Sequence, residues 1–347
     1  MRALLRRMVG LLVLGWLLAG CAAPPASPTA TPRPTSTPVL TSTPTPTQSP
    51  TPTLTPTPTF TPTPAPVCGH VRSLTVLVVG AYPNLYSMAD AVRLVYLDFV
   101  DPAVRVVPLP RDLRVDLPQS APYHSPVKLN SAYFLGTRNF VWDAPPESGA
   151  LQLAATIEEN FGIHVDRYLV VGAEGFARFI DAIGGVPVYF PYPLQDKNTH
   201  ANFSAGQHWL NGRDALKLAR IRMDSNDFVR IQRQSWLLKG VLKSLLQSET
   251  LEQLPQILES FKRMQLSNLT AEDLARATCL LGVMASQNHQ PVFYAVPVDL
   301  LTQTKGEVYI WAIPKEKEAP PSKAFVLLWN DAYREWLQQA LRGEVAP

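Results

Sequence analysis

Four arginines and one glutamine gather in the segment RIRMDSNDFVRIQRQ, where they are Arg220, Arg222, Arg230, Arg233 and Gln234. If the first part is extended, Arg220 and Arg222 point to the same side. A helix that begins at Asp227 as its N-cap places the other three side chains on one face. Guanidinium groups bind phosphate oxygens in pairs and repel one another when no anion lies between them. The segment therefore predicts a phosphate site; the alternative is a solvated basic face.

The elements that position this segment alternate between strands and helices. Apolar runs rich in β-branched residues predict strands at Leu74–Val79, Val92–Phe99, Val104–Leu109, His164–Val171, Val186–Phe190, Val292–Val296 and Val308–Ile313. Amphipathic patterns predict helices at Leu151–Phe161, Gly175–Ile183, Asp227–Leu245, Leu251–Met264, Ala271–Met284 and Ala332–Leu341. Residues 206–218 resemble a turn that enters a helix. We expect an α/β fold, a layered α-β-α sandwich around a central mixed sheet.

The N-terminus has the pattern of a lipoprotein leader. Three arginines precede an apolar run, residues 8–18, that is too short to span a bilayer. The sequence LAGC at residues 18–21 resembles a lipobox, in which the leader is cut before the cysteine. We therefore expect residues 1–21 to be a signal peptide and Cys21 to carry a lipid that anchors the exported chain to the membrane. The alternative is an uncleaved anchor with an incidental cysteine.

A spacer separates this leader from the folded part. Residues 22–67 are almost entirely Pro, Thr, Ser and Ala, with Arg33 as the single charged residue, so they are expected to be disordered. Residues 68–347 are long enough for one large domain, or for one domain with residues 247–347 as an appendage. Four of the 31 basic residues precede Cys68 and none of the 28 acidic residues does, which leaves 27 basic against 28 acidic residues. This near-neutral balance argues against a nucleic-acid partner.

Two cysteines remain once Cys21 carries a lipid. In an oxidising compartment, either Cys68 and Cys279 form one disulfide or Cys279 is a buried apolar residue. The six histidines form no HxxxH or HxH pattern, and no pair of cysteines has metal-ligand spacing. A zinc site is therefore not expected. The sequence also contains no GxSxG motif and no glycine-rich phosphate loop.

Four segments, in their order and spacing, resemble the LytR-CpsA-Psr family, also called the cell envelope-related transcriptional attenuator domain. They are PLPRDLRVDLP (108–118), KLNSAYFLG (128–136), EGFARFIDAIGGVPV (174–188) and GQHWLNGRDALKLARIRMDSNDFVRIQRQ (206–234). The resemblance is close over residues 74–246 and looser over 247–347. It implies a phosphotransferase on the outer face of the cytoplasmic membrane, in the cell wall or periplasmic space. Such an enzyme moves a glycopolymer from a polyprenyl pyrophosphate carrier to peptidoglycan.

The resemblance also implies roles for individual residues. The pyrophosphate contacts are Arg111, Lys128, Asn130, Arg220, Arg222, Arg230, Arg233 and Gln234. Catalysis is expected from Arg111, Arg220 and Arg222, together with Asp112, which either orients Arg111 or serves as a base; orientation is favoured. Asp90 matches an aspartate linked to Mg²⁺, which neutralises phosphate charge. The polyprenyl tail is expected in an apolar tunnel inside the domain, although an apolar stripe also fits a packed core.

This sequence departs from the family pattern at two places. Where the family has GxD and RSD, the chain has GAY at residues 80–82 and MAD at 88–90, with Tyr82 and Met88 at the altered positions. One magnesium carboxylate and one phosphate-binding arginine are therefore missing. Arg93 carries a positive charge nearby, but three residues further along a strand it is expected to face the opposite side. Magnesium is then held by one aspartate and the substrate phosphates, or the site works weakly, binds without turnover, or runs without metal.

These departures leave a second function open beside the transferase. A noncatalytic relative would bind lipid-linked intermediates without turning them over. A third function, transcriptional regulation, is disfavoured, because the lipobox and the exported spacer place the domain away from DNA and its charge is near zero.

Overall fold

A computed structural model describes residues 65–347, except 223–225, 248–252, 254–256, 258–264 and 311–312. Six strands form the central sheet, in the order β11 (Gln265–Ser267), β6 (Arg167–Gly172), β1 (Ser73–Ala81), β2 (Ala89–Asp98), β3 (Ala103–Leu109) and β12 (Val292–Phe293). The sheet is mixed, because β1 runs antiparallel to β2 but parallel to β6. Its inner strands are rich in Val and Leu, as expected for strands that are buried on both faces.

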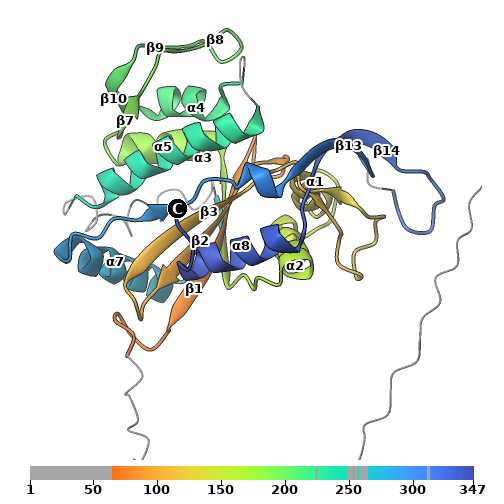
Figure 1. The fold of residues 1–347 in the computed structure, drawn as a ribbon, viewed down its shortest axis with the longest axis horizontal. Coiled ribbons are helices and arrows are strands. Elements are labelled where there is room, and N and C mark those ends of the chain that lie inside the picture. The colour runs from red at the N-terminus through yellow and green to blue at the C-terminus, as the bar shows by residue number, and fades with distance from the viewer. Residues whose placement is uncertain (1–64, 223–225, 248–252, 254–256, 258–264, 311–312) are drawn as a thin grey trace, which may run out of the picture. The chain divides into compact units, whose positions relative to one another are not determined.

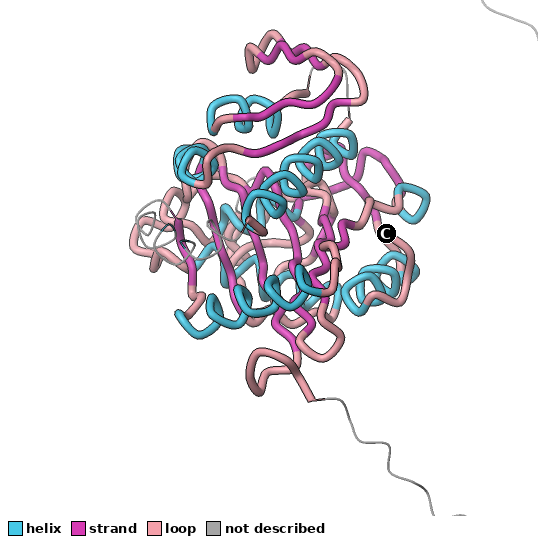
Figure 2. Tube along the Cα trace, turned by 90° about the vertical axis from the view of Figure 1, so that its left-hand side faces the viewer, coloured by secondary structure: helices cyan, strands magenta, loops and turns pink. Residues whose placement is uncertain are grey.

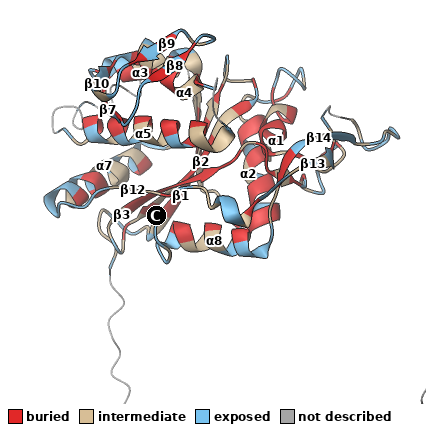
Figure 3. Ribbon diagram, turned by 45° about the horizontal axis from the view of Figure 1, so that its top comes forward, coloured by how far each residue is buried: buried red, intermediate tan, exposed pale blue. Residues whose placement is uncertain are grey.

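Helices cover both faces of the sheet, and α7 and α8 lie on opposite sides of it (Figure 3). One face carries α1 (Leu129–Leu135), α2 (Ser148–Phe161) and α8 (Asp331–Arg342). The other face carries α5 (Asp227–Leu245) and α7 (Ala271–Ser286). Along β1, Leu77 belongs to the first core and Val76 to the second, so alternate residues face different layers. The predicted α-β-α sandwich is confirmed.

A separate core, distinct from the two that cover the sheet, holds together the cap region, defined as residues 173–220 (Figures 1 and 2). Its elements are α3 (Ala173–Ala182), β7 (Val186–Phe190), β8 (Leu194–Asp196), β9 (Ala201–Phe203), β10 (Gly206–Leu210) and α4 (Gly212–Arg220). α4 approaches α3 so closely that a Cβ atom on Gly212 would lie 1.9 Å from the Ala177 carbonyl oxygen. Only glycine fits there. Leu237 of α5 joins the same core, which fixes α5 between the cap region and the sheet.

Several predicted boundaries are wrong. Residues 206–210 form a strand, β10, before α4 begins, so the predicted turn is a hairpin arm. Asn226, not Asp227, is the N-cap of α5, and its side chain accepts a hydrogen bond from the Val229 backbone N–H. The strand predicted at Val308–Ile313 lies earlier, as β13 (Thr302–Val308), and pairs with β14 (Ser322–Leu328), which the sequence reading missed. The helix predicted at Leu251–Met264 lies almost wholly outside the described residues.

The remaining described elements complete the side of the domain around α1. They are β4 (Arg114–Val115), β5 (Val127–Lys128) and the 3₁₀ turn Val298–Leu300. Cys68 and Cys279 are joined by a disulfide, which ties the start of the domain to α7. Across the described ranges, no helix has the length and apolar character needed to cross a membrane. The leader and the spacer lie outside the described residues, apart from the last residues of the spacer.

Candidate functional site

A β-bulge at the start of β2 shapes the site. In the β1–β2 pair, Ala81 lies opposite Ala89 and Gly80 lies opposite Ala91, so Asp90 is an extra residue without a partner. A bulge shifts the alternation of side chains by one position. As a result, Asp90 and Arg93 line the same cavity. The expectation that Arg93 faces away from Asp90 is wrong, because it assumed an uninterrupted strand.

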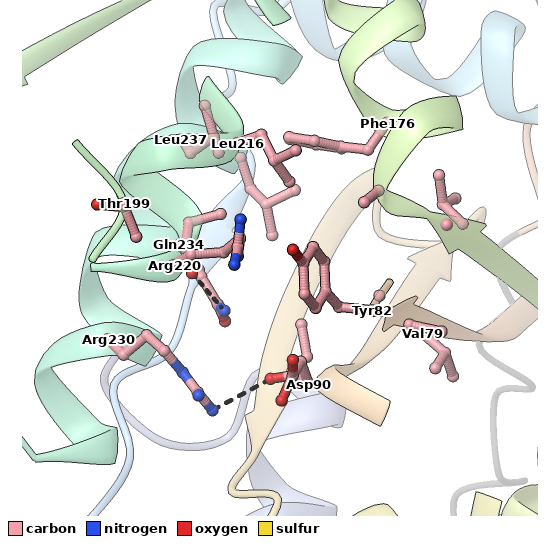
Figure 4. A pocket seen from close by; sticks show the side chains of 18 of the residues that line it. Val79, Tyr82, Asp90, Phe176, Thr199, Leu216, Arg220, Arg230, Gln234 and Leu237 are labelled. Carbon is pink, nitrogen blue, oxygen red and sulfur yellow. Dashed lines mark hydrogen bonds between the residues drawn. The ribbon is translucent and has the colours of Figure 1, made fainter. Parts of the chain in front are cut away.

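Arginines surround the Asp90 carboxylate. Its Oδ1 accepts a hydrogen bond of 2.6 Å from Arg111, and Arg222 lies 3.6 Å from the same oxygen. The Asp90 backbone carbonyl accepts a third contact, of 3.2 Å, from Arg230 (Figure 4). Three arginines from separate parts of the chain are thus brought to one point of the bulge. Predicted site residues far apart in sequence converge here, as the phosphate-site hypothesis requires.

Asp227, at the first turn of α5, connects two of these arginines. It lies 2.5 Å from Arg230 and 3.4 Å from the Nε atom of Arg111. Burial raises the pKa of the Asp227 carboxyl, while the charges of Arg230 and Arg111 act in the opposite direction. The sequence reading treated Asp227 only as a helix cap. Its position shows that it holds the arginines in place.

Asp112 is bound from two sides. Its Oδ1 accepts a hydrogen bond of 2.7 Å from Lys128, and its Oδ2 lies 3.7 Å from Arg111. Only 8% of Asp112 is exposed, and it does not line the cavity. This geometry fits the orienting role that the sequence reading favoured rather than that of a base. Asn130 lies beside the same group, since its backbone N–H donates to the Arg111 carbonyl and its side chain contacts the Met88 sulfur.

Arg220 reaches the cavity by a route that the sequence did not predict. It is the last residue of α4 rather than part of an extended segment, and the chain becomes extended only at Ile221. Its guanidinium carbon lies 3.9 Å from the centre of the Tyr82 ring (Figure 4). A guanidinium stacks favourably on the negative face of such a ring. Arg220 and Arg222 still line the same cavity, one from the helix and one from beyond it.

Asp196 was missed by the sequence reading. Its side-chain oxygens accept hydrogen bonds from the backbone N–H groups of Asn198, Thr199 and Arg222, at 2.8, 3.0 and 2.7 Å. Only 3% of Asp196 is exposed, and the residue lines the cavity. The sequence DKNT at residues 196–199 could have indicated this role, because an aspartate that begins such a turn often accepts hydrogen bonds from the backbone of its own turn. Asp196 fixes the backbone at Arg222.

Arg233 does not line the cavity. The residues of α5 that do are Arg230, Gln234, Leu237 and Leu238. These positions form one arc of the helix, and Arg233 lies just outside it. Arg233 is nevertheless 97% buried, with 3% exposure, so it is part of the interior beside the site.

The cavity has a volume of about 410 Å³ and two chemically different parts. Its charged part contains Asp90, Arg93, Arg220, Arg222, Arg230 and Gln234. Its apolar part is lined by Val78, Val79, Phe176, Leu216, Leu237 and Leu238 (Figure 4). The apolar part runs between the sheet and the helices of the cap region. Such a cavity suits an amphipathic ligand with an anionic head.

The residues present do not fit a resident magnesium ion. Asp90 is already paired with arginines, and the Asp196 oxygens accept backbone hydrogen bonds. Tyr82 provides a neutral phenol that stacks on Arg220 instead of a carboxylate. Within the described part of the chain, no group of three or more His, Cys, Asp or Glu side chains is placed to hold a metal. Magnesium prefers anionic oxygens, and these are engaged elsewhere.

The amino-acid sequence is similar to those of one protein family. The LytR_cpsA_psr family model matches residues 70–317. The regulatory protein MsrR of Staphylococcus aureus (strain Mu50) is 27% identical over 243 residues, 67% of this chain and 68% of that protein. Polyisoprenyl-teichoic acid–peptidoglycan teichoic acid transferase TagV of Bacillus subtilis is 24% identical over 229 residues, 64% of this chain and 53% of that protein.

Solved structures agree. The crystal structure of B. subtilis TagV superimposes with a TM-score of 0.59 and 22% identity, over 80% of this chain and 99% of that chain. The structure of TagT bound to LIIa-WTA gives a TM-score of 0.57 with 17% identity, over 81% of this chain and 96% of that chain. These likenesses show the fold, and the family model, which matches more than half of the chain, shows that this chain belongs to the LytR_cpsA_psr family.

Proposed function

We propose that this protein is a membrane-tethered phosphotransferase that moves a glycopolymer from a polyprenyl pyrophosphate carrier to peptidoglycan. The observation that carries the proposal is the cavity with arginines at one part and aliphatic side chains at the other. A polyprenyl pyrophosphate has the same two parts, an anionic head and an apolar tail. The names of TagV, a teichoic acid transferase, and of TagT bound to LIIa-WTA support this choice of ligand.

The arginines supply the charge that pyrophosphate chemistry needs. When the acceptor hydroxyl attacks the phosphorus next to the sugar, a new oxygen–phosphorus bond forms and the bridging bond to the lipid phosphate breaks. The proton of the hydroxyl passes to the leaving polyprenyl phosphate. Negative charge accumulates on non-bridging and leaving oxygens, and preorganised guanidinium groups stabilise it. Arg220, Arg222 and Arg230 face the cavity, while Arg111 is held beside them by Asp90, Asp112 and Asp227. The polyprenyl phosphate leaves with its tail still in the apolar part.

The metal requirement is proposed to be weaker than in the family pattern. Because the carboxylate of Asp90 is paired with Arg111 and Arg222, we assign the neutralisation of phosphate charge to the arginines. Mg²⁺ from solution would then act through the substrate phosphates rather than through a site built from protein carboxylates.

One observation favours a second function, that of a noncatalytic lipid-binding protein. The same pairing of Asp90, together with Tyr82 at a position where the family has an aspartate, is what a noncatalytic lipid-binding relative would show. Such a protein would hold lipid-linked intermediates without turnover. The two functions share the ligand and differ only in the chemistry.

The tether is proposed from the sequence alone. Cys21 would carry the lipid anchor, and the spacer at residues 22–67 would reach up to about 140 Å if extended at about 3.1 Å per residue. The domain would then work outside the cytoplasmic membrane, within reach of peptidoglycan.

The test uses the full chain in detergent with a polyprenyl pyrophosphate-linked oligosaccharide and peptidoglycan. Transfer is measured as polyprenyl phosphate released and sugar bound to the peptidoglycan. Both are expected with the wild-type protein and are expected to be lost with Arg220→Gln. Tight binding of the lipid without release would instead establish the noncatalytic function. If the lipid does not bind at all, both functions are wrong.

A further inference from the structure

Arg93 is a buried cation on the wall of the cavity. It lies on β2 opposite Val78 of β1, it lines the cavity, and only 2% of it is exposed. Its Nη1 donates to the Val92 carbonyl at 3.0 Å. Its Nη2 donates to the Ile231 carbonyl at 3.3 Å and to the Gln234 side-chain oxygen at 2.9 Å. All three acceptors are neutral.

This arginine differs from three of the arginines beside it in forming no ion pair among the described residues. Arg111, Arg222 and Arg230 each form an ion pair with an aspartate. Among the ion pairs of the described residues, none includes Arg93. Burial and the charge of Arg230 lower the pKa of the Arg93 guanidinium to about 10, although the Asp227 carboxylate acts in the opposite direction, so Arg93 stays protonated at neutral pH. A buried charge that forms no ion pair is costly, and a bound anion would lower that cost.

Two residues that line the cavity carry unpartnered hydrogen-bond donors. The Nε–H groups of Arg93 and Arg230 are both buried and have no hydrogen-bond acceptor. Buried donors are satisfied in nearly all native structures, often by a ligand or water. Both residues line the same cavity, and both face Gln234 or Asp90 with their terminal nitrogens. Two free guanidinium donors on one wall suit a doubly or triply charged phosphate group.

We propose that Arg93 is an additional anion-binding residue of this site. It contacts a phosphate of the pyrophosphate head and restores the positive charge that is missing at Met88. The bulge at Asp90 makes this possible, because it turns Arg93 into the cavity. The proposal deepens the proposed function and rests on it, since it concerns the same ligand and the same cavity.

A purely structural role is the alternative. Arg93 could serve only to hold Gln234 and the Ile231 turn of α5 in place. In that case it would influence the ligand only through Gln234. A double-mutant cycle separates the two roles, because an indirect effect disappears when Gln234 is already absent.

The experiment measures binding of inorganic pyrophosphate by calorimetry to the full chain in detergent, with EDTA present. Arg93→Gln is expected to weaken binding by at least about tenfold, the loss typical of a charge-assisted hydrogen bond. Arg93→Lys keeps the charge but lacks Nε and the forked guanidinium, so its affinity for pyrophosphate is expected to lie between those of the wild type and Arg93→Gln. The matched control is Arg105→Gln, which removes another buried arginine of the sheet, one already paired with Asp98, and is expected to leave affinity unchanged.

The same substitution is then repeated in a Gln234→Ala background. Arg93→Gln is expected to weaken pyrophosphate binding there as well. If it has no effect in that background, or if folded Arg93→Gln binds as wild type does, the proposal is wrong. If Arg93→Gln does not fold, Arg93→Lys decides by the same comparison. Absence of pyrophosphate and polyprenyl phosphate binding by the wild-type protein would contradict the proposed function instead, so the two failures are distinguishable.

Discussion

The guanidinium of Arg220 lies over the ring of Tyr82, with 3.9 Å between its central carbon and the ring centre. The contact joins the end of α4 to the loop after β1, and it holds Arg220 against the cavity without a carboxylate. In the absence of metal, an aspartate at this place would pair with the arginine and compete with a phosphate ligand. The tyrosine leaves the positive charge of Arg220 available to an anion.

Replacing Tyr82 by leucine tests the stacking of Arg220 on the Tyr82 ring. Tyr82→Leu keeps apolar bulk but removes the aromatic face, so Arg220 is expected to lose its fixed position. Affinity for polyprenyl phosphate should fall by about threefold to tenfold, the range of a partly buried cation–π contact. Tyr82→Phe keeps the ring and is the control. Equal losses in the two variants would mean that the hydroxyl, not the stack, is what matters.

Binding of the lipid head is expected to be independent of magnesium. The affinity of the wild-type protein for polyprenyl phosphate should agree within about twofold in EDTA and in millimolar Mg²⁺, because the carboxylates at the site are already paired. Tyr82→Asp places a second carboxylate near Asp90 and is expected to make binding respond to Mg²⁺. A strong magnesium requirement in the wild type, lost in Asp90→Asn, would show that Asp90 holds a metal after all.

Asp273 is expected to make folding depend on acid pH. It caps α7 reciprocally with Thr270 and accepts a hydrogen bond of 2.6 Å from Arg167. Although burial alone raises its pKa, the bonds from Thr270 and Arg167 lower the pKa overall below the usual 3.8. The folded state therefore binds this proton less readily than the unfolded state does. The stabilisation is present above pH 3.8 and is lost as the pH falls through the lowered value.

Asp273→Asn should accordingly reduce the free energy of unfolding at pH 7 by about 1–3 kcal/mol. The deficit should shrink as the pH approaches 3, as measured by urea unfolding at each pH. Asp331→Asn, at the exposed first turn of α8, is the control and should have little effect. A deficit that stays constant down to pH 3 would show that the charge of Asp273 is not the source.

The sequence predicted the layers, and the helix that carries Arg230 and Gln234, because each depends on local pattern. Periodic apolar residues define β1, β2 and α5, and the spacing of Arg230 and Gln234 follows directly from the helix. Val186–Phe190 was also predicted correctly as a strand. It does not join the central sheet but pairs with β10 in the cap region. Its burial alternates along the strand, as is typical of a hairpin with one exposed face.

The details that the sequence did not predict depend on pairing between distant segments. The bulge at Asp90 is defined only by the register between β1 and β2, so Arg93 was placed on the wrong face. Arg220 belongs to α4 because the helix continues two residues past the predicted end at residue 218, which the Arg-x-Arg pattern does not reveal. The pairing of Asp227 with Arg111 links residues more than a hundred positions apart. No local pattern encodes such contacts.

The most direct test compares two ligands on two variants of the full chain. Arg222→Gln alters the charged part of the cavity, and Leu216→Trp fills the apolar part. If one cavity binds both ends of a polyprenyl pyrophosphate, Arg222→Gln will weaken both inorganic pyrophosphate and polyprenyl phosphate. Leu216→Trp will weaken only the lipid. Lipid affinity that is unchanged in folded Leu216→Trp, or pyrophosphate affinity that is unchanged in Arg222→Gln, would contradict the account.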